Sequence, residues 1–202
     1  AGAAGCSCAR PLKLMGAKNI LLVDRKGVLN KNRSDLNKYN QDLAIDSKCN
    51  TLKEAMMDSD VFIGVSGANL LAAELVANMK KKPIIFALAN PDPEILPSQA
   101  HAVRDDIVMA TGRSDFPNQV NNVLGFPFLF RGALDAKATE ITNKMLIAAA
   151  NALADLAKED VPQSVLDAYG AQSMSFGKEY FIPKPFDPRL IDWVAKAVKE
   201  AS

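Results

Sequence analysis

The stretch AGAAGCSCARPLKLMGAKNILLVD, residues 1–24, decides the fold class. It reads in order as a glycine-rich turn, an apolar helix near 4–15, a buried strand at 19–24 and an acidic residue. In a dinucleotide-binding turn the glycines bend the chain and let the backbone approach a pyrophosphate, which the helix N-terminus faces. Gly2 and Gly5 fit the second and third glycines of that motif. Asp24 follows at close to the spacing of about 20 residues expected for a carboxylate that binds the ribose 2′-hydroxyl.

The same turn is also compatible with a purely structural bend. The first glycine of the motif would lie one position before Ala1. The strand that normally precedes the turn would also lie before Ala1. In the usual strand order 3-2-1-4-5-6 that strand lies at the centre of the sheet. We therefore expect the chain to be cut from a longer protein and to lack the first strand of its sheet.

Short apolar runs alternate with helical patterns further along the chain. The runs are hydrophobic throughout, without clean alternation, which is typical of parallel strands covered on both faces by helices. The pattern predicts an α/β fold with a doubly wound, Rossmann-type parallel sheet. The remaining predicted strands are 61–66, 83–89 and 107–112, and the predicted helices between them are 51–58, 70–80 and 97–104.

A C-terminal helical extension is expected after Arg131. It consists of a long Ala-rich helix at 135–158, a loop-like segment at 159–187 and a last helix at 188–201 that Asp187 would cap. The polar stretch 25–46 predicts an exposed loop with a small hairpin. We expect the whole of 1–202 to form one nucleotide-binding domain.

Composition narrows the functional classes. The 202 residues include 49% hydrophobic residues, and 24 Lys and Arg balance 23 Asp and Glu. A net charge near zero provides no field to attract nucleic acid, and no apolar run approaches the roughly 20 residues that span a bilayer. Three cysteines, two of them only two residues apart, indicate a reducing compartment such as the cytoplasm.

Several candidate ligand-binding residues follow the predicted strands, where open α/β sheets bind their ligands. Ser66 and Gly67 would allow the nicotinamide half of a cofactor to approach the backbone, or would simply form a tight turn. Asn90 could donate its amide to a substrate oxygen, or cap a turn. Asn121 and Asn122 could bind a carboxylate or hydroxyl, or cap a helix.

Groups for acid–base or metal chemistry are sparse. The single histidine, His101, is expected to be an exposed bystander on a surface helix. Asp92 and Glu94 are separated by Pro93 and are expected to be solvated turn residues rather than a metal pair. The residues themselves therefore predict that the chain holds a cofactor and orients a substrate, without providing an acid, a base or a metal cage.

The chain contains the motifs GAAG, VDRKGVL, VFIGVSG, FALANPDPEI, ATGRSDFPNQVNNVLGFP and IPKPFDPR. Together these motifs resemble the C-terminal, coenzyme-binding domain of malic enzymes, especially the bacterial type. The resemblance implies oxidation of (S)-malate at C2 with hydride transfer to NAD or NADP, and decarboxylation to pyruvate assisted by Mg²⁺ or Mn²⁺. It also implies a homo-oligomer, dimer or tetramer, with malate as its small-molecule substrate.

The resemblance assigns roles to individual residues. Asp24 matches the ribose-binding acid, Asn90 matches an asparagine between the nicotinamide ribose and malate, and Asn121 and Asn122 match a pair of which one reaches the substrate carboxylate. The residues that match the phosphate-binding turn are Ala1, Gly2, Ala3, Ala4 and Gly5.

Coenzyme choice stays open, because Asp24 favours a free 2′-hydroxyl whereas Arg25 and Lys26 could pair with a 2′-phosphate. The family's tyrosine acid, lysine base and three metal-binding carboxylates would precede Ala1, so the 202 residues alone are expected to be inactive. A non-catalytic NAD(P)-sensing module, the coenzyme domain of a different dehydrogenase and a structural oligomerisation domain are the alternatives.

Overall fold

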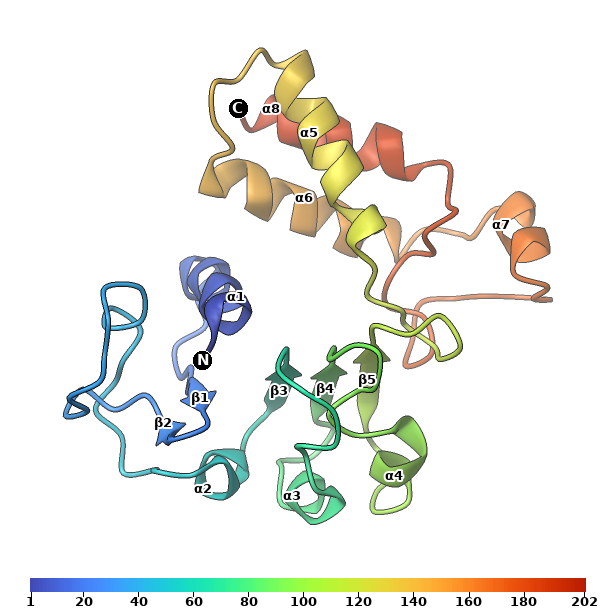
Figure 1. The fold of residues 1–202 in the computed structure, drawn as a ribbon. Coiled ribbons are helices and arrows are strands. Elements are labelled where there is room, and N and C mark those ends of the chain that lie inside the picture. Colours follow the sequence, from blue (N-terminus) through green and yellow to red (C-terminus); the bar gives the residue numbers. More distant parts are fainter. The chain divides into compact units, whose positions relative to one another are not determined.

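The computed structural model describes residues 1–202, which form two compact units, 1–109 and 110–202. The first unit carries most of a three-stranded parallel sheet in the order β3-β4-β5 (Figure 1). The strands are β3 (Val61–Gly64), β4 (Ile84–Ala87) and β5 (Val108–Thr111). Their parallel pairing and the helices between them confirm the predicted α/β class.

Three short helices cover one face of this sheet. They are α2 (Leu52–Met56), α3 (Ala73–Ala77) and α4 (Pro97–His101), which lie within the predicted helices but are shorter. Thr51 caps α2 in a capping box with Glu54, which satisfies two N–H groups at the helix start. The buried side chains of this layer form one core, which includes Val76, Ile85, Ile95 and Ile107.

The predicted strand at 19–24 is only partly a strand. Just β1 (Val23–Asp24) pairs, and it pairs antiparallel with β2 (Gly27–Val28) instead of joining the parallel sheet. Gly27 turns this hairpin with φ +110°, and a Cβ there would lie 2.0 Å from the Asn50 carbonyl oxygen. A glycine is therefore required at this turn.

The polar segment after the hairpin is more buried than its composition suggests. Leu29, Leu43 and Ala44 pack with Cys6 and Ala9 of α1 (Ala3–Leu14) in a second core. The expected small hairpin is confirmed, but the description of 25–46 as simply exposed is wrong. The few apolar residues in it bury against the first helix.

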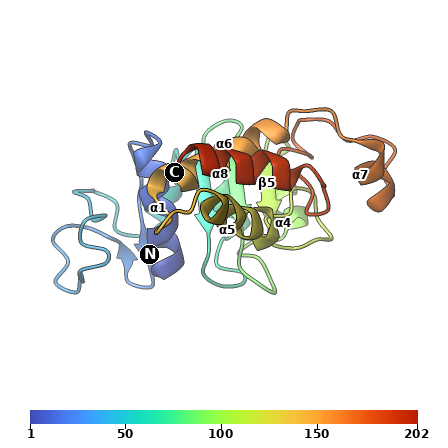
Figure 2. The same ribbon diagram turned by 90° about the horizontal axis from the view of Figure 1, so that it is seen from above.

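The second unit consists mainly of helices. Helices α5 (Phe126–Asp135), α6 (Asn143–Leu156) and α8 (Lys196–Glu200) lie side by side in both views (Figures 1 and 2), preceded by the 3₁₀ turn η1 (Asn122–Leu124) and the π-helical turn η2 (Ile191–Ala195). A third buried core, which includes Leu129, Met145 and Val194, holds them together. A fourth helix, α7 (Gln163–Ala168), lies inside the segment that we expected to be loop.

The helix expected at 135–158 is shorter than predicted and follows a separate helix that we did not expect: α6 spans Asn143–Leu156, whereas α5 ends at Asp135. Lys137 has a left-handed backbone (φ 56°) that ends α5, and Thr142 caps α6 by accepting a hydrogen bond from the Met145 N–H at 3.3 Å. In the last helical segment the apolar residues Leu190, Val194 and Val198 are fully buried, whereas Ile191 is exposed. Helix composition alone did not reveal these two end signals.

Candidate functional site

The predicted phosphate-binding turn forms the start of α1. Gly2 is the N-cap residue with an extended backbone, and no side chain caps the N–H groups of the first turn. Uncapped N–H groups at a helix start are the donors that bind phosphate in nucleotide-binding folds. A Cβ at Gly2 would meet no atom within 4 Å, so the space above this turn is open.

The turn lies beside the ends of two strands in the first unit. The Ala1 nitrogen donates a hydrogen bond to the Val23 carbonyl in the two-residue strand β1. A Cβ on Gly5 would lie 3.8 Å from Val65, directly after β3, and 3.9 Å from Leu22. These are ordinary contacts, so the described residues do not require glycine at position 5 for packing. The structure does bring the turn, Asp24 and the end of β3 together.

Asp24 is held by a neighbouring arginine. Its Oδ2 accepts from Arg33 Nη2 at 2.8 Å, and its Oδ1 accepts from Arg33 Nη1 at 3.0 Å and from the Lys26 N–H at 2.8 Å. The hydrogen bonds from Arg33 hold the pKa of Asp24 below its usual range. The sequence singled out Asp24, Arg25 and Lys26 here but missed Arg33, because only the folded loop brings it to the carboxylate.

The residues after β3 and β4 face a buried carboxyl group. Ser66 and Asn90 are exposed, and Gly67 is half-buried. Beneath them Glu94 is completely buried, and it accepts hydrogen bonds from the Ser66 N–H at 2.9 Å and the Ala89 N–H at 3.0 Å. The expectation that Glu94 is a solvated turn residue is therefore wrong. No local sequence signal marks it, since Asp-Pro-Glu also fits an exposed turn.

The asparagine pair belongs to the second unit. Asn121 is the N-cap of η1, and its side-chain oxygen accepts from the Val123 N–H at 3.1 Å. Its amide NH₂ group stays available as a donor. Asn122 is exposed in the first turn. The alternative that Asn121 caps a helix is thus confirmed, and this cap also fixes where its amide group lies.

A nearby asparagine that the sequence did not single out anchors this loop. Asn118 is buried with φ 55°, donates from Nδ2 to the Lys178 carbonyl at 2.7 Å and accepts from the Phe181 N–H at 2.9 Å. It connects the 111–122 segment to the Ile-Pro-Lys-Pro region. Only the tertiary structure makes this connection visible.

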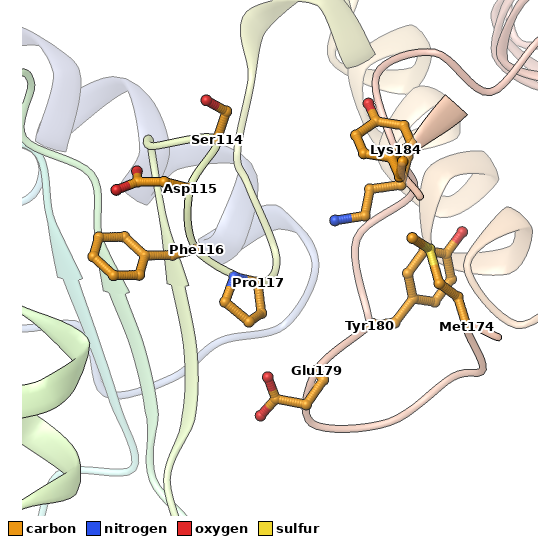
Figure 3. Close-up of a pocket in the computed structure, with 9 residues that line it drawn as sticks. Ser114, Asp115, Phe116, Pro117, Met174, Glu179, Tyr180 and Lys184 are labelled. Atoms are coloured by element: carbon orange, nitrogen blue, oxygen red, sulfur yellow. The ribbon is translucent and has the colours of Figure 1, made fainter. Parts of the chain in front are cut away.

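The second unit also has an open hollow of about 280 Å³ (Figure 3). Burial lowers the pKa of Lys184, whose ammonium lies 5.1 Å from the ring centre of Tyr169. Asp115 on the opposite wall is engaged by Arg113 at 2.7 Å. Acidic and basic groups are mixed here, so the hollow does not define a ligand. Its lining is Ser114, Asp115, Phe116, Pro117, Tyr169, Met174, Glu179, Tyr180 and Lys184.

Residues 1–202 contain no group of three or more His, Cys, Asp or Glu side chains arranged to hold a metal ion. The three cysteines are free; Cys6 is buried, Cys49 is half-buried and Cys8 is exposed. His101 is exposed, as expected. None of the helices combines the length and apolar character needed to cross a membrane.

The parallel sheet with α-helical connections and an uncapped helix start beside its strand ends defines an α/β domain of the Rossmann class. Residues 12–168 match the family model described as malic enzyme, NAD binding domain. The chain belongs to this malic enzyme family.

Individual relatives agree with this assignment. The chain is 52% identical over 204 residues to the NADP-dependent malic enzyme of Halomonas elongata, which covers all of this chain and 48% of that protein. It is 46% identical over 205 residues to the NAD-dependent malic enzyme of Rhizobium meliloti, again covering the whole chain and 27% of that protein. The chain thus spans about half or less of the length of these relatives.

Solved structures show the same similarity. The crystal structure of the NAD-dependent malic enzyme from Thermotoga maritima matches with a TM-score of 0.82 and 37% identity, over 98% of this chain and 49% of that one. The malic enzyme of Entamoeba histolytica matches with a TM-score of 0.84 and 34% identity, over 99% of this chain and 40% of that one.

Proposed function

We propose that this chain is the coenzyme-binding part of an enzyme that oxidises (S)-malate at C2 and decarboxylates it to pyruvate and CO₂. The single observation that carries the proposal is the open, uncapped start of α1 next to Asp24 and the end of β3, in a chain of the malic enzyme family. NAD or NADP, when bound, accepts the hydride from malate. The residues of this chain would bind the coenzyme and malate and orient them relative to each other.

The coenzyme would lie along the strand ends of the first unit. Its diphosphate would accept hydrogen bonds from the N–H groups of residues 1–5, and its adenine ribose would approach Asp24. Ser66 and Gly67 would contact the nicotinamide half. The exposure of Ser66 and the space above Gly2 support this orientation.

Malate would be bound by neutral amide groups. Asn90, Asn121 and Asn122 can each donate an N–H to a carboxylate or hydroxyl oxygen without adding charge. The free NH₂ group of Asn121 supports this role because its oxygen is already used in capping η1. No general acid or base among residues 1–202 is assigned to the reaction.

The Arg33–Asp24 pair supports the use of NADP. A free carboxylate at this position repels a 2′-phosphate, but Asp24 has its charge compensated by a guanidinium at 2.8 Å. Arg25 and Lys26 are exposed next to it. We expect the protein to accept NADP at least as well as NAD.

The Mg²⁺ or Mn²⁺ expected for the decarboxylation does not fit a site formed by these residues alone, because they contain no suitable ligand cluster. We therefore assign no step through a metal to this chain. A cytoplasmic homo-oligomer remains part of the proposal. The exposed strip of Phe126, Phe130 and Leu134 on α5 is supporting evidence, since subunit interfaces cover apolar strips of this kind.

The test measures both malate oxidation and coenzyme binding in the natural full-length protein. We expect malate-dependent reduction of NADP or NAD in the presence of Mn²⁺ or Mg²⁺. We also expect Asn90→Ala and Asn122→Ala to lower malate oxidation at least about tenfold while the coenzyme Kd stays within about twofold. Absence of activity with both coenzymes would contradict the enzyme and favour a sensing module. Absence of any nucleotide binding would favour a structural domain.

A further inference from the structure

Glu94 has an unusual position for a carboxyl group in a turn. It follows β4 by seven residues, yet none of it is exposed to solvent. Burying a carboxyl group is costly unless its oxygens receive hydrogen bonds. Here Oε1 accepts from the Ser66 N–H at 2.9 Å and from Ser66 Oγ at 3.4 Å, and Oε2 accepts from the Ala89 N–H at 3.0 Å. The two oxygens therefore connect two different loops.

Backbone hydrogen bonds connect the same loops. The Leu71 N–H donates to the Glu94 carbonyl at 3.0 Å, and the Asn69 N–H donates to the Pro93 carbonyl at 3.1 Å. The turn containing Glu94 is thus held against the loop that follows β3. Its side chain then reaches back to the second residue after each strand, Ser66 after β3 and Ala89 after β4.

The space for this side chain is provided by a glycine. A Cβ on Gly64, the last residue of β3, would lie 2.3 Å from Glu94 Cδ and 2.6 Å from Oε1. Real Cβ atoms do not approach other heavy atoms so closely, so Glu94 and Gly64 fit only because Gly64 has no side chain. The glycine at position 64 and the position of the Glu94 carboxyl group therefore depend on each other.

We propose that Glu94 is a positioning residue that fixes the distance between Ser66–Gly67 and Asn90 around the nicotinamide half of the coenzyme. The inference rests on the proposed function. Glu94 binds the N–H groups of Ser66 and Ala89, which directly precede Gly67 and Asn90 in sequence. Hydride transfer needs donor and acceptor within about 3–3.5 Å, and a misplacement of about 1 Å costs on the order of a hundredfold in rate.

The experiment compares variants of the natural full-length protein. Glu94→Gln keeps the shape but places an NH₂ group opposite one of the two N–H donors, so one loop loses its acceptor. Gly64→Ala keeps the carboxyl but displaces it by the steric conflict described above. Glu74→Gln, on the exposed side of α3, makes the same chemical change away from the site and is the matched control.

Three measurements separate positioning from folding. We expect Glu94→Gln and Gly64→Ala to lower kcat with NAD(P) about 10- to 100-fold. We expect both to bind ADP-ribose, which represents the adenine half, within about twofold of wild type. Amide hydrogen exchange at Ser66 and Ala89 should become faster in both variants. Glu74→Gln should match wild type in all three measurements.

Unchanged kcat in folded Glu94→Gln and Gly64→Ala would overturn the proposal. So would an equal loss of ADP-ribose and dinucleotide binding, or failure of both variants to fold, because either result would mean that Glu94 only stabilises the domain. Failure of the wild-type protein to bind ADP-ribose or NAD(P) would instead contradict the proposed function. That result is distinguishable because it does not depend on any variant.

Discussion

Arg33 and Asp24 form a bidentate ion pair at the end of the β1–β2 hairpin, with Nη2 2.8 Å from Oδ2 and Nη1 3.0 Å from Oδ1. Arg33 also binds Asp35 through Nε and Nη2 at 2.9 Å. Its guanidinium is therefore shared between two carboxylates, and most of it is shielded from solvent. This geometry compensates the negative charge of the residue that we expect next to the adenine ribose.

Replacing Arg33 should change coenzyme preference. In Arg33→Met the Asp24 carboxylate loses its partner and would repel a 2′-phosphate, so we expect KM for NADP to rise about tenfold more than KM for NAD. Steady-state kinetics with both coenzymes in the natural full-length protein measure this ratio. The matched control is Arg10→Gln, which removes the exposed pair with Asp42 and should leave the ratio unchanged. Equal effects on both coenzymes would contradict the charge argument.

The cap and the free amide of Asn121 can be separated by substitution. Asn121→Ser keeps a side-chain oxygen that can cap η1 but removes the NH₂ group, whereas Asn121→Ala removes both. We expect Asn121→Ser to raise KM for malate at least about tenfold with a nearly normal melting temperature. Asn121→Ala should add a loss of stability of about 1 kcal/mol. Wild-type malate kinetics in Asn121→Ser would show that the residue only caps.

Arg104 should be a strong stabilising residue of the first unit. Its guanidinium donates to the carbonyls of Val76, Met79 and Lys80 at 2.9–3.1 Å and binds Asp106 at 2.7 Å. We expect Arg104→Met to cost about 2–4 kcal/mol, because the carbonyls of two buried residues, Val76 and Met79, lose their donor.

Thermal denaturation measures this cost. The control Arg131→Met removes only an exposed pair with Asp135 and should cost less than about 0.5 kcal/mol. Similar melting temperatures for the two variants would refute the role of Arg104.

Asp106, the partner of Arg104, should make the stability of the fold depend on pH. Hydrogen bonds from Arg104 and from the Lys82 N–H hold the pKa of Asp106 far below its usual range. A lowered native pKa stabilises the fold above the unfolded value of about 3.9, and this contribution is lost as the pH falls towards the native pKa. We therefore expect Asp106→Asn to flatten the decrease in melting temperature below pH 4. In the Arg104→Met background, which removes the main cause, Asp106→Asn should flatten it much less.

Gly132 should be essential for helix packing in the second unit. A Cβ there would lie 2.4 Å from the Ala195 carbonyl oxygen and 2.7 Å from Val198 Cβ, and the carbonyl is backbone that cannot move aside cheaply. We expect Gly132→Ala to destabilise the unit by about 1–3 kcal/mol. Gly125→Ala, where a Cβ meets nothing within 4 Å, is the control. Equal melting temperatures would show that α5 can shift away from the last helix.

The sequence by itself determined the α/β class and the sites of most elements in the first unit. Continuous apolar runs such as 83–89, alternating with helical patterns, are typical of parallel strands in an α/β fold, so they indicate the class without any tertiary information. The motifs around Asn90 and Asn121 likewise led to the malic enzyme family, which the family model confirms. Each of these signals lies within a short stretch of sequence, so it can be recognised without knowing which distant residues pack against it.

Only the tertiary structure decided how the candidate site is supported. Glu94, Arg33 and Asn118 bind partners that lie 28, 9 and 60 residues away in sequence. Glu94 lies in what reads as an exposed turn, Arg33 in a polar loop and Asn118 at a left-handed bend. The local sequence of each would be the same without such a partner. The shortening of the helix expected at 135–158 to α6 has the same origin. Helix α5 ends just before the left-handed backbone at Lys137, which helix propensity does not encode.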